Sequence, residues 1–123
     1  MRLERSMPVL QVRDVRVSAA SCARLGFTAA LWGEGPDFAI VKRDGVTLAL
    51  DRARDGEVPV NQWWAAYLHT DDGAALHDSF SAAGIEATEM QHPTYYGCDD
   101  FGVIDPDGHR TAFGQDRGGN YGL

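Results

Sequence analysis

The stretch Phe101–Gly114 reads FGVIDPDGHRTAFG and predicts a β-hairpin. Its centre, Asp105–Gly108, has a turn-forming residue at every position: Pro fixes φ at about −65°, Asp tolerates turn conformations, and Gly accepts a positive φ. Short apolar runs on both sides of this turn, Phe101–Ile104 and Thr111–Phe113, can pair as antiparallel strands. The hairpin therefore provides a pattern with which the rest of the chain can be compared.

The same hairpin pattern occurs earlier in the chain. Phe38–Leu50 aligns with Phe101–Phe113 without a gap. Upstream, Leu25–Phe27 echoes Ala83–Ile85, where a helix is expected to stop at a glycine before a strand begins. One unit of strand, helix and three strands therefore occurs twice. Two copies of this length indicate a duplicated half-domain and not a solenoid.

The repeat predicts an α+β protein that forms a single domain over residues 1–123. Its two βαβββ halves lie at about residues 7–51 and 64–115, and their two small sheets are expected to curve around a shared cleft. The expected strands are Met7–Val12, Phe27–Gly33, Phe38–Lys42, Val46–Asp51, Trp63–His69, Glu86–Met90, Phe101–Ile104 and Thr111–Phe113.

Aspartate side chains are expected to cap both helices, because they can accept hydrogen bonds from the free N–H groups of a first turn. Asp14 precedes a helix at about Val15–Leu25. Asp71 or Asp72 precedes a second helix that ends near Ala83. The two helices thus occupy the same place in the two halves of the repeat.

Composition fits a cytoplasmic protein. Hydrophobic residues make up 44% and charged residues 24% of the 123 residues, which is ordinary for a globular domain. We find no secretory leader and no apolar run of the roughly 20 residues that a membrane span needs. The net charge of −7 disfavours a nucleic-acid partner and suits a cationic ligand. Cys22 and Cys98 fit no zinc spacing and are interpreted as reduced thiols.

The chain resembles the vicinal-oxygen-chelate superfamily, which includes glyoxalase I, fosfomycin resistance proteins, extradiol dioxygenases and bleomycin resistance proteins. The resemblance rests on Pro8–Asp14, Arg24–Phe27, Tyr96-Gly97 and Asp105–His109, which fall in the right order on the repeat. The first strand and Val41–Leu48 are most similar to the bleomycin-binding branch. The resemblance implies the two-module fold of that superfamily.

Metal-dependent members of the superfamily use their metal as the Lewis acid of the reaction. Here the four metal-ligand positions hold Met7, Trp64, Ala49 and Ala112. Thioether, indole and methyl groups cannot assemble such a site, so the resemblance implies a non-catalytic protein without a cofactor. The alternative is a metal-dependent lyase, transferase or dioxygenase with non-standard ligands, for which His69 and His92 are the candidate metal ligands. A binding subunit or regulator that keeps only the fold is a third possibility.

Aromatic residues are the first candidates for a ligand site, because their rings can stack on a flat ligand. The alternative is that they form core packing between the sheets. The resemblance places Trp64 at a position that faces the cleft. Alternation along the strand directs Trp63 the other way, toward the core or an interface.

Acidic residues are the second candidates. Glu34, Asp37, Asp99 and Asp100 are expected in loops, the last two in the aromatic loop Gln91–Asp100, and they offer counter-charges to a cationic ligand or are simply solvated. The resemblance implies a homodimer that sequesters a bulky aromatic or cationic toxic compound in clefts between halves of two protomers. The expected ligand-binding residues are Trp32, Phe38, Trp64, Tyr95, Tyr96 and Asp99.

Overall fold

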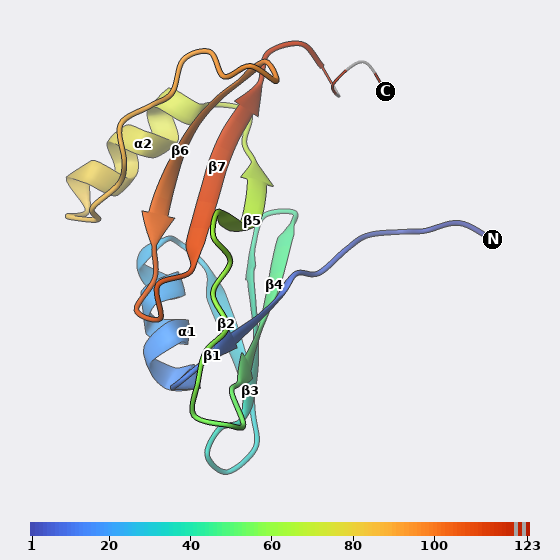
Figure 1. Cartoon of the computed structure of the whole chain (residues 1–123), viewed down its shortest axis with the longest axis vertical. Coiled ribbons are helices and arrows are strands. Elements are labelled where there is room, and N and C mark those ends of the chain that lie inside the picture. Colours follow the sequence, from blue (N-terminus) through green and yellow to red (C-terminus); the bar gives the residue numbers. More distant parts are fainter. Residues whose placement is uncertain (120, 122) are drawn as a thin grey trace. The chain divides into compact units, whose positions relative to one another are not determined.

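The computed structural model describes residues 1–119, 121 and 123. The chain divides into two compact units, Met1–Val60 and Asn61–Leu123 (Figure 1). Each unit contains one sheet and one helix and holds one half of the repeat. In the described part of the chain, neither helix reaches the length and apolarity that a membrane span needs.

The first unit contains a four-stranded sheet with the strand order β1-β4-β3-β2. β1 runs parallel to β4, and the other neighbours are antiparallel. Every expected strand of this half forms, with β1 and β2 somewhat shorter than expected. The elements are β1 (Val9–Val12), α1 (Val15–Arg24), β2 (Thr28–Trp32), β3 (Phe38–Arg43) and β4 (Val46–Arg52).

One face of this sheet forms the core of the first unit together with α1. Val15 and Ala19 of the helix are buried, and the Asp14 carboxylate accepts hydrogen bonds from the N–H groups of Arg16 and Val17, as its predicted capping role requires. β1 and β3 show the alternation typical of a sheet with one buried face, whereas β2 is exposed along its length and β4 has three consecutive buried residues. The buried strand residues are Leu10, Val12, Ala39, Val41, Leu48, Ala49 and Leu50.

The second unit contains a three-stranded sheet with the order β5-β7-β6. β5 is parallel to β7, and β6 is antiparallel to it. Asp72, and not Asp71, caps the helix by accepting a hydrogen bond of 3.0 Å from the Ala75 N–H group. The elements are β5 (Trp64–His69), α2 (Gly73–Ala82), β6 (Cys98–Ile104) and β7 (Arg110–Asp116).

Three phenylalanine rings form the centre of the second core. Phe80 of α2 lies 6.0 Å from Phe101 of β6 and 5.1 Å from Phe113 of β7, measured between ring centroids. The two strand rings stack on each other at 5.5 Å. Because side chains alternate along a strand, this cluster turns the intervening residues of β6 and β7 to the face away from α2.

The strand expected at Glu86–Met90 does not form; this segment makes one isolated bridge to β6, at Ala87, and a second bridge follows at Gln91. Thr88 explains the interruption. Its N–H donates to the Gly102 carbonyl at 3.0 Å, while its hydroxyl, in place of a backbone carbonyl, accepts from the Gly102 N–H at 2.8 Å. Thr94 bonds Cys98 in the same way through its hydroxyl. Such side-chain bonds compete with a regular ladder.

β6 begins at Cys98, three residues earlier than expected. Asp99 and Asp100 are therefore buried strand residues, and the expectation that they lie in a loop is wrong. The chain extends here because its backbone finds hydrogen-bond partners on both sides: the Asp100 N–H and carbonyl bond Gln91, and Asp100 pairs with Gly114 of β7.

The two hairpins also differ by one residue in register. In the first, Ile40 pairs with Ala49, so a gapless repeat would place Val103 opposite Ala112. The structure instead pairs Gly102 with Ala112. The longer turn between Ile104 and Arg110 permits this shift, and a shift of one residue exchanges the two faces of a strand.

Candidate functional site

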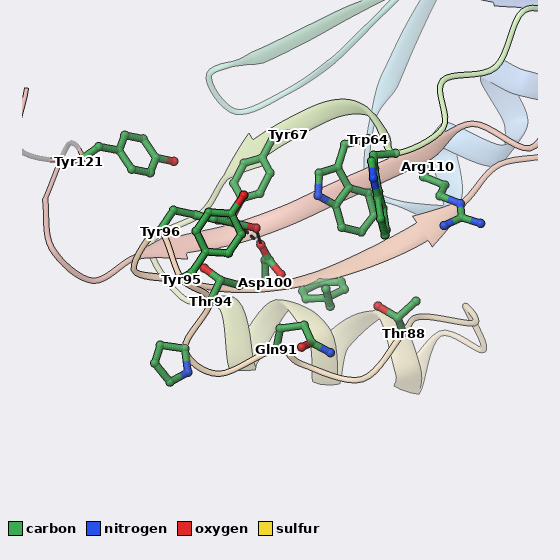
Figure 2. A pocket seen from close by; sticks show the side chains of 13 residues that line it. Trp64, Tyr67, Thr88, Gln91, Thr94, Tyr95, Tyr96, Asp100, Arg110 and Tyr121 are labelled. Carbon is green, nitrogen blue, oxygen red and sulfur yellow. Dashed lines mark hydrogen bonds between the residues drawn. The ribbon is translucent and has the colours of Figure 1, made fainter.

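In a pocket of the second unit, the rings of Trp64 and Tyr67 lie against the backbone at two strand glycines (Figure 2). A Cβ atom on Gly102 would lie 2.7 Å from the indole ring of Trp64, and one on Gly114 would overlap the phenol ring of Tyr67. Glycine within a strand often marks such a close approach. The missing side chains leave room for both aromatic rings to lie directly on the backbone of β6 and β7.

A β-bulge in β5 brings Trp64 and Tyr67 onto the same face of the sheet. The register of β5 against β7 shifts between Trp64 and Ala66. In a regular strand, residues 64 and 67 would face opposite sides, but the extra residue of a bulge resets the alternation. Both rings therefore reach the pocket.

The walls of the pocket are largely aromatic, and its volume is about 1120 Å³. This volume is at the upper end of the range typical of small-molecule sites. The segment between α2 and β6 supplies one wall through Thr88, Gln91 and Pro93–Tyr96. The aromatic side chains that line the pocket are Trp63, Trp64, Tyr67, Tyr95, Tyr96, Phe101 and Tyr121.

A carboxylate lies within this aromatic surface. Asp100 is 2% exposed, and its Oδ2 atom accepts hydrogen bonds from the hydroxyls of Tyr67, at 2.9 Å, and Tyr96. Burial raises the pKa of both tyrosines above the ordinary value, and the hydrogen bonds to Asp100 raise it further. Both hydroxyls are therefore protonated donors at neutral pH.

Asp99, the neighbour of Asp100, is held by the protein's own basic side chains. Its carboxylate binds Arg117 Nε and lies 2.7 Å from His92 Nδ1. Desolvation opposes ionisation, but the hydrogen bonds from Arg117 and His92 outweigh it and lower the pKa of Asp99. Asp99 thus ties the segment at His92, which leads into a pocket wall, to the chain that follows β7.

Tyr121 closes one side of the pocket. Its hydroxyl lies 2.8 Å from His69 Nε2 and 3.7 Å from the Cys98 thiol. Burial, together with the hydrogen bond to Cys98, raises the pKa of Tyr121 to about 12. His69 therefore takes part in a tyrosine contact, and within residues 1–119, 121 and 123 no three His, Cys, Asp or Glu side chains are grouped as metal ligands.

The structure brings together three of the six residues predicted to bind a ligand. Trp64, Tyr95 and Tyr96 line the pocket. Asp99 forms the ion pairs described above and is not among the lining residues. Trp32 and Phe38 form a cross-strand pair in the first unit, with ring centroids 6.1 Å apart, on a face where Trp32 is 51% exposed.

None of the other lining residues was predicted to bind a ligand, and Trp63, Tyr67 and Asp100 are the most informative of them. Trp63 was expected in the core or at an interface; it is 67% exposed and lines the pocket, so the core alternative is wrong. Tyr67 was not considered, and Asp100 was considered as a loop counter-charge but was not among the expected ligand-binding residues. The glycines at 102 and 114 were the available indication, because a glycine in the interior of an apolar strand suggests that another group approaches there.

No protein-family model matches the sequence, and no curated protein matches it. Solved structures do match. A bleomycin-binding protein in complex with bleomycin is 23% identical, with a TM-score of 0.78 over 94% of this chain and 100% of that chain. A bleomycin resistance determinant encoded on the transposon Tn5 is 22% identical, with a TM-score of 0.78 over 94% of this chain and 99% of that chain.

A glyoxalase-related enzyme from Clostridium phytofermentans is 14% identical, with a TM-score of 0.78 over 94% of this chain and 97% of that chain. Together these similarities show the fold. The chain has the α+β fold shared by bleomycin-binding and glyoxalase-related proteins, and the predicted vicinal-oxygen-chelate fold is confirmed.

Proposed function

We propose that the protein binds a bulky aromatic small molecule in the pocket of its second unit and sequesters it without chemical change. The observation that carries this proposal is the largely aromatic lining of the pocket, in which the Trp64 ring lies directly on the backbone at Gly102. A partly buried ring held in one position is suited to stacking on a flat ligand, because little side-chain freedom is lost on binding.

The residues at the superfamily's metal-ligand positions support binding without catalysis. Trp64 and Ala112 occupy two of these positions in the second unit, and neither side chain is a ligand for a divalent metal. Two solved structures with the same fold are a bleomycin-binding protein with bleomycin and a bleomycin resistance determinant. A bleomycin-like compound is therefore the first ligand to test.

The proposal includes a cytoplasmic homodimer. Trp32 and Phe38 lie on a half-exposed face of the first sheet, and apolar faces of this kind are often covered by a partner. In such a dimer, the first unit of one copy would add its aromatic pair to a ligand cleft. This arrangement would give Trp32 and Phe38 their predicted part in binding.

Calorimetric titration with metal-free bleomycin tests the proposal. We expect Trp64→Ala to weaken binding by about tenfold or more, since an aromatic stack and its buried area are worth about 1.4 kcal/mol or more. Trp32→Ala should weaken binding less. Val17→Ala, on an exposed part of α1, is the matched control and should leave binding unchanged.

Mass spectrometry of the recovered ligand separates sequestration from catalysis. We expect bleomycin to be released from the denatured protein with its mass unchanged. A modified ligand would overturn the non-catalytic part of the proposal. Equal affinities of the unmodified protein and Trp64→Ala would remove Trp64 from the site.

A further inference from the structure

We infer that the pocket selects an aromatic ligand that carries opposite charges at its two ends, a cationic group at Asp100 and an anionic group at Arg110. This inference rests on the proposed function, because it names the ligand class of the same pocket. It is carried by two charged groups on one face of the sheet that have no ion-pair partner in the described part of the chain, with an aromatic ring between them (Figure 2).

The Asp100 end of the pocket lacks a cation. Both tyrosine hydroxyls bind Oδ2, whereas Oδ1 receives no hydrogen bond from residues 1–119, 121 or 123. The hydroxyls of Tyr67 and Tyr96 are neutral, so they orient the carboxylate without neutralising it. A buried carboxylate is costly unless a positive group compensates it. A ligand ammonium or guanidinium beside Oδ1 would supply that group.

The Arg110 end presents the opposite charge. Arg110 is exposed and lines the pocket, and its guanidinium forms no ion pair or hydrogen bond with the described part of the chain. A free guanidinium offers a planar pair of donors that fits a carboxylate, sulfonate or phosphate. This end of the pocket is therefore suited to an anionic group.

The spacing of the two charges defines the ligand's shape. Asp100 pairs with Gly114, which lies four residues beyond Arg110 on β7, and this separation corresponds to roughly 13 Å along the strand. Figure 2 shows the Trp64 ring between the two charged side chains. A flat ring on Trp64 with a cationic substituent on one side and an anionic substituent on the other matches all three groups.

Four naphthalene probes with the same ring and different charges test the inference by calorimetry. They are 5-(aminomethyl)naphthalene-1-sulfonate, 1-(aminomethyl)naphthalene, naphthalene-1-sulfonate and 1-(hydroxymethyl)naphthalene. We expect the zwitterion to bind about tenfold more tightly than either singly charged probe, because only the zwitterion forms a charge-assisted bond at both ends. The neutral probe should bind most weakly.

Two variants assign the charges to their residues. Asp100→Asn should remove the advantage of the amine-bearing probes and leave binding of the sulfonate unchanged or stronger. Arg110→Gln should remove the advantage of the sulfonate-bearing probes. Arg110 is exposed, so its substitution leaves the core intact, and the four probes on the unmodified protein decide the inference even where Asp100→Asn fails to fold.

The outcomes separate this inference from the proposed function. Equal affinities for the four probes, or tighter binding of a singly charged probe, overturn the selection of opposite charges and leave the aromatic pocket in place. Failure of bleomycin and of all four probes to bind overturns the proposed function itself.

Discussion

The two halves of the chain follow one repeat but treat the open faces of their sheets differently. In the first half, β2 pairs with β3 along its whole length, and the face that carries Trp32 and Phe38 remains partly exposed. In the second half, the segment after α2 makes only isolated bridges and supplies a wall of the pocket, from Thr88 to Tyr96. A strand in one copy therefore corresponds to a pocket wall in the other.

Side chains that compete with the backbone account for this difference. Thr88 and Thr94 place hydroxyls where a continuing strand would place carbonyls, and Pro93 has no N–H to donate. The strand β2 has no proline and pairs regularly. Two copies with the same pattern of apolar residues can therefore diverge through a few residues that redirect hydrogen bonds.

Substitution of a strand glycine is expected to give the largest difference in stability between the two halves. Gly114→Val should lower the free energy of unfolding by about 1–3 kcal/mol, because the new side chain occupies the space of the Tyr67 ring. Asp51 holds the same position in the repeat, is partly exposed, and forms an ion pair with Arg54 at 3.6 Å. Asp51→Val should cost less than about 1 kcal/mol. Equal losses in denaturant unfolding would contradict the comparison.

Tyrosine ionisation reports on the second half alone, because all four tyrosines lie in that unit. The raised pKa values of Tyr67 and Tyr96 predict that phenolate absorbance appears late in an alkaline titration of the folded protein. The unfolded chain loses these protons near pH 10, so stability should fall as pH rises above about 10.

Asp100→Asn sharpens this test. It removes the carboxylate's charge and changes its hydrogen bonds but leaves the rings buried, so the pKa values of Tyr67 and Tyr96 should fall part of the way toward the ordinary value. Superimposable titration curves for the variant and the unmodified protein would show that Asp100 does not contribute to these raised pKa values.

Removal of one ion pair from each half is expected to reduce stability by a smaller amount. Asp37→Asn removes an exposed pair with Arg52, at 3.1 Å, and should cost about 0.2–1 kcal/mol. Asp99→Asn should lower the melting temperature more, because Asp99 is buried and bonded to both His92 and Arg117. A larger loss from Asp37→Asn would argue against Asp99 as the tie between its two segments.

The Asp99 effect should depend on pH with a defined sign. The pKa of Asp99 is lowered from 3.8 by folding, so its contribution is present above pH 3.8 and is lost as the pH falls through the folded-state value. Melting curves of Asp99→Asn and the unmodified protein should therefore converge in acid. A constant difference across this range would contradict the assigned cause.

Local patterns in the sequence were sufficient to predict most of the fold. The helix caps, the hairpin turns and the repeat depend on neighbouring residues, and Asp14 and the turn at Asp105–Gly108 act as these patterns indicate. The prediction of a strand at Glu86–Met90 is wrong. The β-propensity of this segment does not reveal that the Thr88 hydroxyl accepts a hydrogen bond from the Gly102 N–H.

The pocket was less predictable because it depends on two shifts of a single residue. The bulge in β5 brings Tyr67 beside Trp64, and the register of β6 turns Asp100 to the same face. Neither shift changes the composition or the apolar pattern of the strands. Each shift exchanges the two faces of a strand and therefore decides which side chains line the pocket.

The segment that walls the pocket also protects the chain from self-association. β6 is an outer strand of its sheet, and its outward backbone groups at Cys98, Asp100 and Gly102 are already bonded by Thr94, Gln91 and Thr88. An outer strand with free backbone groups is a template for aggregation. If the proposed ligand holds this segment in place, its binding would therefore also lower the tendency of the protein to aggregate.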